Sequence, residues 1–350
     1  MVAVALVSLE PWDDTWRRNQ HIACRLVKAG DVASLIWIAP PVRRRPPPPV
    51  RPQDGITVLT PHLRLPRRLG GVVDVARRLR SILVEVDVLW VNDPRLGAHL
   101  LEGGTQALYD VTDDWRSYPF PDRLIRGLVR AEDRLAESAD TVVCSKVLAD
   151  RWHDRYGLSP CVIHNGVDLD AHRVALPVRL PGLGPHIGYV GTLQPQRLDV
   201  ELVLRLASET SVGTVHLLGP DALGDDVRQC LRDAEGVMLH PPVEASRVPS
   251  WMAAMDVLVA PHLVNAFTLS LDAIKAYEYC AARKPVVATP TSGFQHLAGA
   301  GVRLGEGQAF ITHVRESLAS PASASTTPVP GSSWDDRARA FGAALRAARS

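Results

Sequence analysis

The stretch Leu269–Thr289 reads LSLDAIKAYEYCAARKPVVAT. Apolar side chains between Leu271 and Ala281 recur at the spacing of an amphipathic helix. The run Pro285–Thr289 has the apolar composition of a buried strand, and only Arg283 and Lys284 separate the two. A helix that turns so quickly into a buried strand is typical of an α/β fold with a parallel sheet.

The polar side chains of this helix are spaced so that they share a face. Asp272, Lys275 and Glu278 lie three residues apart. An ionised carboxylate accepts several hydrogen bonds, so Glu278 beside a strand end could bind a pair of sugar hydroxyls. The alternative is an ordinary solvated helix glutamate.

Length and composition are those of a globular protein. A chain of 350 residues is long enough for two domains, and its net charge of +1 does not favour nucleic acid as a partner. Its five cysteines contain no CxxC pair, which argues against a disulfide framework or zinc site and fits a reducing cytoplasm. The apolar run Val2–Val7 is short and indicates a first strand, not a signal peptide.

Strand-like runs alternate with helical stretches along the whole chain, which predicts an α/β fold of two Rossmann-like, doubly wound parallel-sheet domains. We expect a first domain over 1–176, a proline-rich linker over 177–185 and a second domain over 186–319. An Ala/Ser/Thr/Pro-rich flexible connection over 320–333 would lead to a C-terminal helix over 334–350. The predicted strands are 2–8, 34–38, 88–91, 107–111, 141–144, 186–190, 215–218, 237–239, 257–259 and 286–288, and the predicted helices of the first domain are 16–29, 77–83 and 123–138.

The window Pro41–Arg80 is strongly basic, with ten arginines against Asp54 and Asp74. A solvated loop is the plainer interpretation. The other is a surface that contacts anionic lipid or a lipid-diphosphate acceptor.

The string Lys275–Thr289 resembles the donor-site signature of retaining glycosyltransferases of family 4 (glycosyl transferases group 1), in the branch that makes cell-surface and teichuronic-acid-type polysaccharides. The resemblance implies the GT-B fold, with two domains facing a cleft and a last helix that crosses back to the first domain. In this family the helix glutamate binds the ribose hydroxyls of a nucleotide-sugar, a role that maps onto Glu278. Lys275, in the same string, is assigned to donor binding.

The turn after strand 186–190 is the expected phosphate site, because a glycine turn exposes backbone N–H groups. The family usually has an arginine directly after this glycine and a second cation five residues later. Here Gly191 is followed by Thr192, and Arg197 takes the second position. The resemblance therefore assigns the donor diphosphate to Gly191, Thr192 and Arg197, with Arg197 also catalytic.

Two further segments of the second domain resemble donor-binding elements. Gly219, at the end of strand 215–218, resembles a turn near the nucleotide base. The loop Phe267, Thr268, Leu269 and Ser270 could present backbone amides to the sugar or diphosphate. Many family members have a glutamate where Ser270 stands, and Asp272 is a possible substitute carboxylate.

The first domain carries candidate acceptor residues. The start of its first helix provides Trp16, Arg17, Asn19 and Gln20, although an ordinary amphipathic helix would also explain this pattern.

A strand that ends in three acids resembles another segment of the same enzyme branch. We expect Asp110 on the acceptor side, Asp113 as a catalytic residue in the cleft and Arg116 as the counter-charge. The segment Asn165–Asp168 resembles the hinge of the family.

The resemblance implies a cytoplasmic hexosyltransferase-type enzyme, with possible contact at the inner membrane face. It would move a sugar from a UDP- or GDP-linked donor to a glycan or lipid-linked acceptor, retain the anomeric configuration and need neither cofactor nor metal. A nucleotide-sugar epimerase of the same fold, which could use Asp110, Asp113 and His216 as acid/base groups, is one alternative. A catalytically weak partner subunit, suggested by Thr192 and Ser270, is the other.

Overall fold

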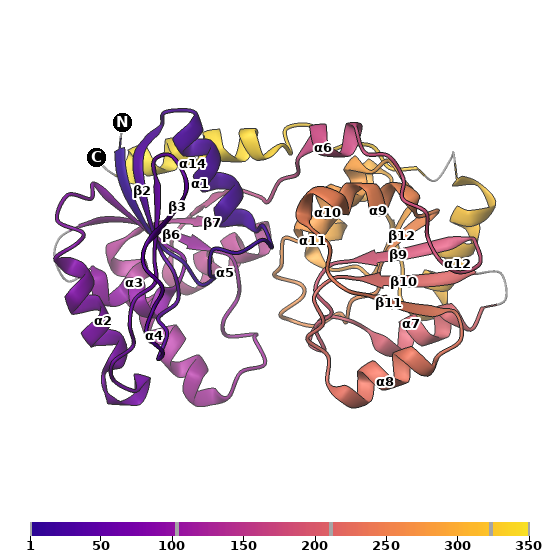
Figure 1. Cartoon of the computed structure of the whole chain (residues 1–350), viewed down its shortest axis with the longest axis horizontal. Helices are drawn as coiled ribbons and strands as arrows, with labels where there is room; N and C mark the ends of the chain where they lie inside the picture. Colours follow the sequence, from indigo (N-terminus) through magenta and orange to yellow (C-terminus); the bar gives the residue numbers. More distant parts are fainter. Residues whose placement is uncertain (1, 102–104, 210–212, 322–324, 349–350) are drawn as a thin grey trace. The chain divides into compact units, whose positions relative to one another are not determined.

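A computed structural model describes residues 2–101, 105–209, 213–321 and 325–348, which form two compact units (Figure 1). The first unit contains Met1–His164 and Trp334–Ser350, and the second contains Asn165–Ser333. Each has its own sheet and its own hydrophobic core. The chain therefore builds two α/β units, as its alternating pattern predicts.

The sheet of the first unit has the strand order β3-β4-β2-β1-β5-β6-β7-β8. All its neighbours are parallel except the edge hairpin of β3 and β4. Its central strands are continuously apolar because helices cover both faces. The strands are β1 (Val2–Val7), β2 (Val32–Ile38), β3 (Val50–Gln53), β4 (Ile56–Leu59), β5 (Val88–Val91), β6 (Gln106–Val111), β7 (Asp140–Val143) and β8 (Cys161–Val162).

Side-chain caps fix the starts of several helices in this unit. Asp93 accepts a hydrogen bond from the amide of Arg95 at the start of α3, and Ser145 accepts one from Leu148 at the start of α5. These caps are why the helices follow so closely on the strand ends. The helices are α1 (Arg18–Lys28), η1 (Arg67–Leu69), α2 (Gly71–Arg80), α3 (Pro94–Leu100), α4 (Asp122–Ser138), α5 (Lys146–Tyr156) and α14 (Trp334–Ala348).

The C-terminal helix α14 belongs to the first unit, so the predicted return to the first domain is confirmed. It packs beside α1, as Figure 1 shows. The ring of Phe341 lies 4.3 Å from that of Trp90 in β5, and Trp334 stacks on His21 at 4.5 Å between ring centroids. Residues 349–350 of the predicted helix lie outside the described residues.

The second unit has a fully parallel sheet with the order β11-β10-β9-β12-β13-β14. The order reverses direction at β9, and open α/β sheets bind ligands at the carboxyl ends of strands beside such a switch point. Its strands are β9 (His186–Val190), β10 (Thr214–Leu218), β11 (Val237–His240), β12 (Val257–Ala260), β13 (Val286–Ala288) and β14 (Arg303–Leu304).

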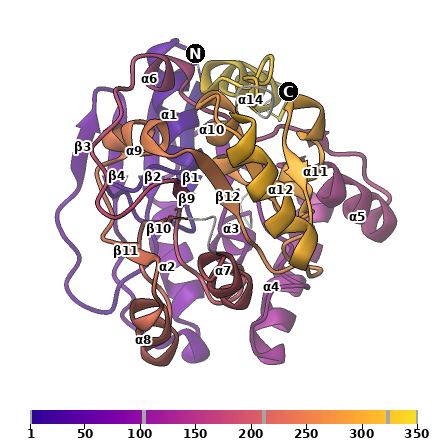
Figure 2. The same ribbon diagram turned by 90° about the vertical axis from the view of Figure 1, so that its right-hand side faces the viewer.

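Two separate cores cover the faces of this sheet. Side chains of α7, α8 and α12 pack on one face and those of α9 and α10 on the other. The ribbon of this unit can be followed in Figure 2. This layering brings the start of α10 to the carboxyl end of β9. The helices are α6 (Leu169–Arg173), α7 (Val200–Ala207), α8 (Asp225–Asp233), η2 (Ala245–Arg247), α9 (Val248–Ala254), α10 (Ile274–Ala281), α11 (Ser292–Gln295), η3 (Ala298–Ala300) and α12 (Gly307–Ala319).

The units divide between His164 and Asn165, before the linker predicted at 177–185. The reason is that Asn165 hydrogen-bonds Asp272, which holds the following segment, including α6, in the second unit. The predicted connection over 320–333 is also packed in its described part. Thr326 is buried and its hydroxyl donates to the Lys284 carbonyl at 3.0 Å. Residues 322–324 of this connection lie outside the described residues.

The basic window Pro41–Arg80 is not the solvated loop that its composition suggests. It contains β3, β4, η1 and α2, and β4 pairs with β2. Alternating burial of Ile56 and Val58 on the sheet explains why β4 forms despite the proline-rich flank. Six of the ten arginines therefore lie on these elements (Arg51, Arg67, Arg68, Arg77, Arg78 and Arg80), and the other four lie in the connecting loops.

Candidate functional site

Two glycines bring bare backbone to the carboxyl edge of the second sheet. Gly191 follows β9 with φ of 144°, and Gly219 follows β10 with φ of 143°. A Cβ on Gly219 would lie 2.4 Å from the Gly191 carbonyl oxygen, and a Cβ on Gly191 would lie 2.6 Å from Nζ of Lys275. Only glycine fits at either position, so the turn after β9 has a structural requirement as well as the predicted phosphate role.

The segment that carries Arg197 is tied to the loop after β12. The amide of Leu263 donates to the Arg197 carbonyl at 2.7 Å, and Leu198 forms an isolated bridge with His262. The guanidinium of Arg197 lies 5.3 Å from the ring centroid of Phe267. Thr192 contributes its carbonyl, which accepts a hydrogen bond from the Tyr189 hydroxyl at 3.2 Å.

Lys275 projects from the first turn of α10 over Gly191. Its ammonium donates to the Tyr189 hydroxyl at 2.6 Å and lies 3.5 Å from Nε2 of His262. Burial, reinforced by the positive charge of Arg197, lowers the pKa of Lys275 to about 7. Burial and the charges of Lys275 and Arg197 hold the pKa of His262 well below its usual range, so this imidazole is neutral. Lys275 thus places a cationic side chain over the glycine turn, within the electrostatic influence of Arg197.

Glu278 stands one turn further along α10, half-buried. Burial raises the pKa of its carboxyl to about 7, opposed by the charge of Lys275. Within the described residues no hydrogen bond to its carboxylate is found. An acceptor group that is desolvated in this way gains most from a ligand that donates hydrogen bonds, such as a pair of hydroxyls.

The loop from Phe267 to Ser270 is less available than predicted. The amides of Thr268 and Leu269 donate to Asn265, and the amide of Ser270 donates to the Phe267 carbonyl. The hydroxyls of Thr268 and Ser270 are buried and donate to backbone carbonyls at 2.6 and 2.7 Å. The loop therefore satisfies these three amides itself in the conformation described, and their binding to the donor stays a prediction.

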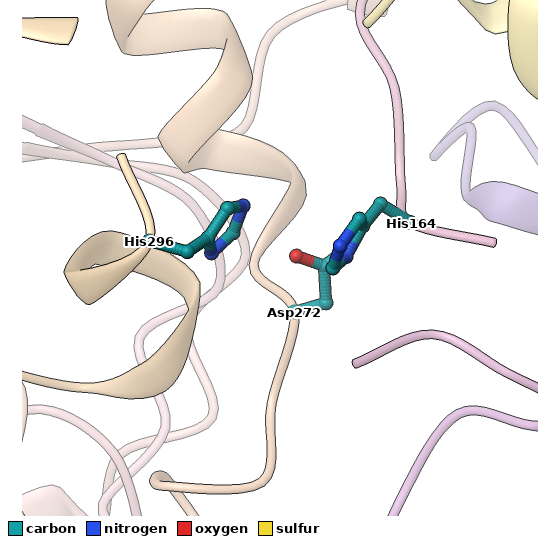
Figure 3. A group of neighbouring side chains, drawn as sticks. All are labelled: His164, Asp272 and His296. Atoms are coloured by element: carbon teal, nitrogen blue, oxygen red, sulfur yellow. The ribbon is translucent and has the colours of Figure 1, made fainter. Parts of the chain in front are cut away.

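Asp272 is not a substitute for the missing glutamate. It precedes α10 instead of sharing the helical face of Lys275 and Glu278. Its buried carboxylate accepts hydrogen bonds from the Asn165 amide and from the Tyr277 hydroxyl, the latter at 2.9 Å. Figure 3 shows its side chain on the segment leading into α10. Both acceptor oxygens are used within the fold, so the role of Asp272 is structural.

In the first unit, three of the predicted acceptor residues are buried. Asp110 is fully buried, and the Arg18 guanidinium donates to its carboxylate at 3.1 Å. Asn19 donates to Asn92 at 2.8 Å. Gln20 closes the first turn of α1, because its Oε1 accepts from the Arg17 amide at 3.1 Å. The side chains of Asp110, Asn19 and Gln20 thus have partners within the fold, and their assignment to an acceptor stays a prediction.

Trp16 and Arg17 remain at the surface. Trp16 is 40% exposed, and its ring lies edge-on to His21. The guanidinium of Arg17 contacts Glu10 at 3.2 Å and Asp13 at 2.9 Å. Of the predicted acceptor residues, these two keep an accessible polar surface.

The acids after β6 are separated from one another by different partners. Asp114 is buried and pairs with Arg151, and it also accepts the Ser117 hydroxyl at 2.7 Å. The predicted counter-charge Arg116 instead contacts Asp133 at 3.4 Å. Asp113 stays half-buried at the strand end, where it accepts the Thr112 hydroxyl at 3.0 Å. Asp113 is thus less buried than Asp110 and Asp114, and its role in the site stays a prediction.

Sequence reasoning missed Tyr189 and His262 as partners of Lys275, and Arg18 as the partner of Asp110. The polar Tyr189 among the apolar residues Ile187 and Val190 of β9 was the available signal, since a buried phenol needs a partner. Nothing in the sequence indicates that Arg18 turns inward. The epimerase alternative loses two of its candidates, because Asp110 is paired with Arg18 and His216 is buried between His186 and His240 at 3.0 and 2.8 Å.

Comparisons with known proteins agree with this arrangement. Residues 16–171 match the model of Glycosyltransferase Family 4, and residues 184–320 match that of Glycosyl transferases group 1. The chain is 26% identical over 324 residues to TuaH of Bacillus subtilis (strain 168), whose name describes it as a teichuronic acid biosynthesis glycosyltransferase. This match covers 83% of this chain and 81% of TuaH. Both halves of the chain thus carry glycosyltransferase domains.

Solved structures share the fold at low sequence identity. Sucrose-phosphate synthase from Thermosynechococcus elongatus has a TM-score of 0.73 at 16% identity, covering 100% of this chain and 96% of that one. Trehalose 6-phosphate synthase from Burkholderia multivorans has a TM-score of 0.70 at 13% identity, covering 99% and 97%. HepE from Anabaena in complex with UDP-glucose has a TM-score of 0.67 at 15% identity, covering 99% and 95%. The fold is GT-B.

Proposed function

We propose that this chain, which carries two glycosyltransferase domains, moves a sugar from a nucleotide-sugar to a glycan or lipid-linked acceptor with retention of configuration. The observation that carries the proposal is the cluster at the carboxyl edge of the second sheet. There Lys275 lies over the bare backbone of Gly191 and feels the positive charge of Arg197, with the Glu278 carboxylate one helical turn away.

Each part of this cluster suits one part of a nucleotide-sugar. Arg197 and Lys275 suit the diphosphate, and Glu278 suits the ribose hydroxyls. When the sugar leaves, negative charge grows on the diphosphate, and fixed cations would stabilise it without a metal ion. The acceptor hydroxyl would attack from the side of the leaving group, which retains the configuration. Asp113 is the candidate in the first unit for a contact with the sugar or acceptor.

The relatives suggest the substrates. TuaH is named for teichuronic acid biosynthesis, and HepE was solved with UDP-glucose. We therefore infer a UDP- or GDP-linked hexose as donor, a cell-surface polysaccharide or its lipid-linked precursor as acceptor, and work in the cytoplasm.

A thermal-shift screen across UDP-, GDP- and dTDP-sugars tests the proposal. A ligand at 100 times its dissociation constant stabilises a protein by about 2.7 kcal/mol, which a melting curve resolves. A clear shift with one nucleotide class is expected. No shift with any of them would contradict a donor site and favour a partner subunit without catalytic activity.

Variants of the cluster locate the donor within it. Glu278→Ala should weaken donor binding by about 1.5–3 kcal/mol in titration calorimetry, the range for hydrogen bonds to charged groups. Arg197→Ala should weaken the nucleotide-sugar more than the bare nucleoside. Equal losses for both ligands would mean that Arg197 acts through the fold, and unchanged affinity in Glu278→Ala would remove the ribose assignment.

Peripheral contact with an anionic membrane is a further part of the proposal, supported by a surface of the first unit. Leu65, Leu69 and Val73 are 45, 64 and 49% exposed and stand among arginines around η1 and α2. A recess of about 680 Å³ beside them is lined by Pro41, Arg43, Leu63, Pro66, Arg67 and Arg68. Exposed apolar side chains flanked by cations are the pattern of an interfacial lipid-binding surface.

Vesicle co-sedimentation tests this contact. The protein should sediment with vesicles that contain anionic lipid at low salt, and salt should release it. Leu65→Ser with Leu69→Ser should reduce sedimentation and leave nucleotide binding intact, with Val174→Ser, an exposed apolar residue of the second unit, as the control. A wild-type protein that stays in the supernatant would show that the surface does not bind lipid. None of the described helices is long and apolar enough to cross a membrane.

A further inference from the structure

Lys275 lies at the position from which a cation can reach a ligand above the glycine turn. Its Nζ lies 2.6 Å from the point where a Cβ of Gly191 would be, directly over the backbone that follows β9. Thr192, the next residue, carries no charge. The cation at the turn therefore comes from a different element, the first turn of α10.

Four side chains determine the charge of this ammonium group. Tyr189 from β9 accepts its hydrogen bond, and His262 from the loop after β12 lies 3.5 Å away. Arg197 opposes its positive charge, whereas Glu278 on its own helix favours it. Burial is the main cause of both shifts: it lowers the pKa of Lys275 to about 7, helped by Arg197, and raises the pKa of Glu278 to about 7, opposed by Lys275. Before a ligand binds, both the Lys275 amine and the Glu278 carboxyl are thus only partly ionised near neutral pH.

We propose that Lys275 is a proton-coupled cation of the donor site: a bound diphosphate draws a proton onto its amine, and the resulting ammonium makes the second cationic contact with the phosphates beside Arg197. The inference rests on the proposed function, because it needs a nucleotide at this turn. The bond formed is N–H on Lys275, and the proton comes from buffer. Ribose hydroxyls would at the same time draw Glu278 into its ionised form, which releases a proton.

These two changes give binding a pH-dependent proton balance whose sign can be worked out. At pH 8 an amine with a pKa near 7 is about nine-tenths neutral and a carboxyl with that pKa is about nine-tenths ionised, so binding takes up about 0.8 proton in total. At pH 6 the amine is already charged and the carboxyl is mostly protonated, so binding releases about 0.8 proton. The balance changes sign close to pH 7.

Titration calorimetry of the full chain with UDP and with GDP measures this balance, in pairs of buffers that differ in ionisation enthalpy. At pH 8 the phosphates of both nucleotides are fully ionised, so they contribute no proton. His262 is neutral at this pH. Wild-type protein should take up close to one proton at pH 8. At pH 6 binding should release more than one proton, because the terminal phosphate, with a second pKa of about 6, is about half protonated there and adds its own proton to the release from Glu278.

Two variants assign the proton. Lys275→Arg keeps a cation that does not titrate, so it should bind within a few-fold of wild type without uptake at pH 8. Lys275→Met should bind at least ten-fold more weakly and also show no uptake. Binding by wild type without proton uptake at pH 8, or uptake that persists in Lys275→Arg, would overturn the inference while leaving the proposed function standing. Absence of binding by either nucleotide, with no shift in the nucleotide-sugar screen, would overturn both.

Discussion

Each of the two units has charged side chains at the carboxyl edge of its own parallel sheet, but the charges have different neighbours in the two units. In the first unit Arg18 and Asp110 meet as opposite charges, at 5 and 0% exposure, and the Arg18 guanidinium donates to the Asp110 carboxylate and to the His164 carbonyl. In the second unit Lys275 lies near another cation, Arg197, and both lysine and Glu278 have pKa values pushed toward neutrality by burial.

This contrast separates structural charges from charges that serve a ligand. A buried pair completes the electrostatics of the fold by itself, and removing either partner leaves an uncompensated charge. A cluster whose members oppose one another is stabilised when a ligand of opposite charge arrives. We therefore expect that replacing a charged side chain by a neutral one lowers the free energy of unfolding in the first unit and raises it in the second.

The largest effect should come from Asp110→Ala. This substitution leaves the buried guanidinium of Arg18 without its carboxylate partner, so the free energy of unfolding should fall by about 3–5 kcal/mol in urea denaturation. Asp113→Asn is the matched control, because Asp113 is half-buried at the same strand end and should change stability by less than about 1 kcal/mol. If both variants lose the same stability, Asp110 is not distinguished by its pairing.

The acid Asp114 provides a second pair of variants. Arg151→Ala removes the partner of a buried carboxylate and should cost about 2–3 kcal/mol. Arg116→Ala removes a solvated contact with Asp133 and should cost less than about 0.5 kcal/mol. Chemical denaturation of both variants measures the two losses. If Arg116 were the counter-charge of Asp114, Arg116→Ala would lose more stability than Arg151→Ala.

The fold was accessible from the sequence because the periodic pattern depends on local residues. β9 and β13 begin and end at the predicted residues, since both are short apolar runs bounded by turn residues. The hairpin of β3 and β4 was hidden by its prolines and arginines, because an edge strand needs few apolar residues.

The site was harder to predict, because partners distant in sequence decide which polar groups reach a ligand. Asp110 and Asp113 look alike in the sequence, yet only Asp110 meets Arg18. Likewise the spacing suggested that Asp272 and Glu278 share a face, but Asp272 is held by the Asn165 amide before the helix begins. The sequence pattern could therefore predict where strands end, but not which polar side chains pair with one another at those ends.

The histidines of the second unit predict a response to acid. Burial and its two neighbouring histidines lower the pKa of His216 to about 4. Because the folded state resists protonation, stability is complete above the unfolded pKa of about 6.5 and falls as pH drops toward 4. Between pH 7 and pH 5 the loss from His216 alone should be about 2 kcal/mol.

His216→Leu should remove that part of the pH dependence, whatever its effect at pH 7. Denaturant midpoints measured from pH 7 to pH 5 give the two slopes. His313→Leu is a suitable control, because its ring is partly exposed on α12. Equal slopes in wild type and His216→Leu would show that His216 is not the acid-sensitive group.

The central claim, that the charges of the second unit are arranged for a ligand, is tested most directly by melting Lys275→Met and wild type at pH 8, each with and without saturating nucleotide. Without nucleotide the variant should melt several degrees higher, because at pH 8 an amine whose pKa is about 7 in the folded state and about 10.5 in the unfolded state destabilises the fold by about 3 kcal/mol. With nucleotide the order should reverse, since wild type gains the contact that the variant lacks. A variant that melts below wild type without nucleotide, and gains as much from nucleotide as wild type does, would contradict the account.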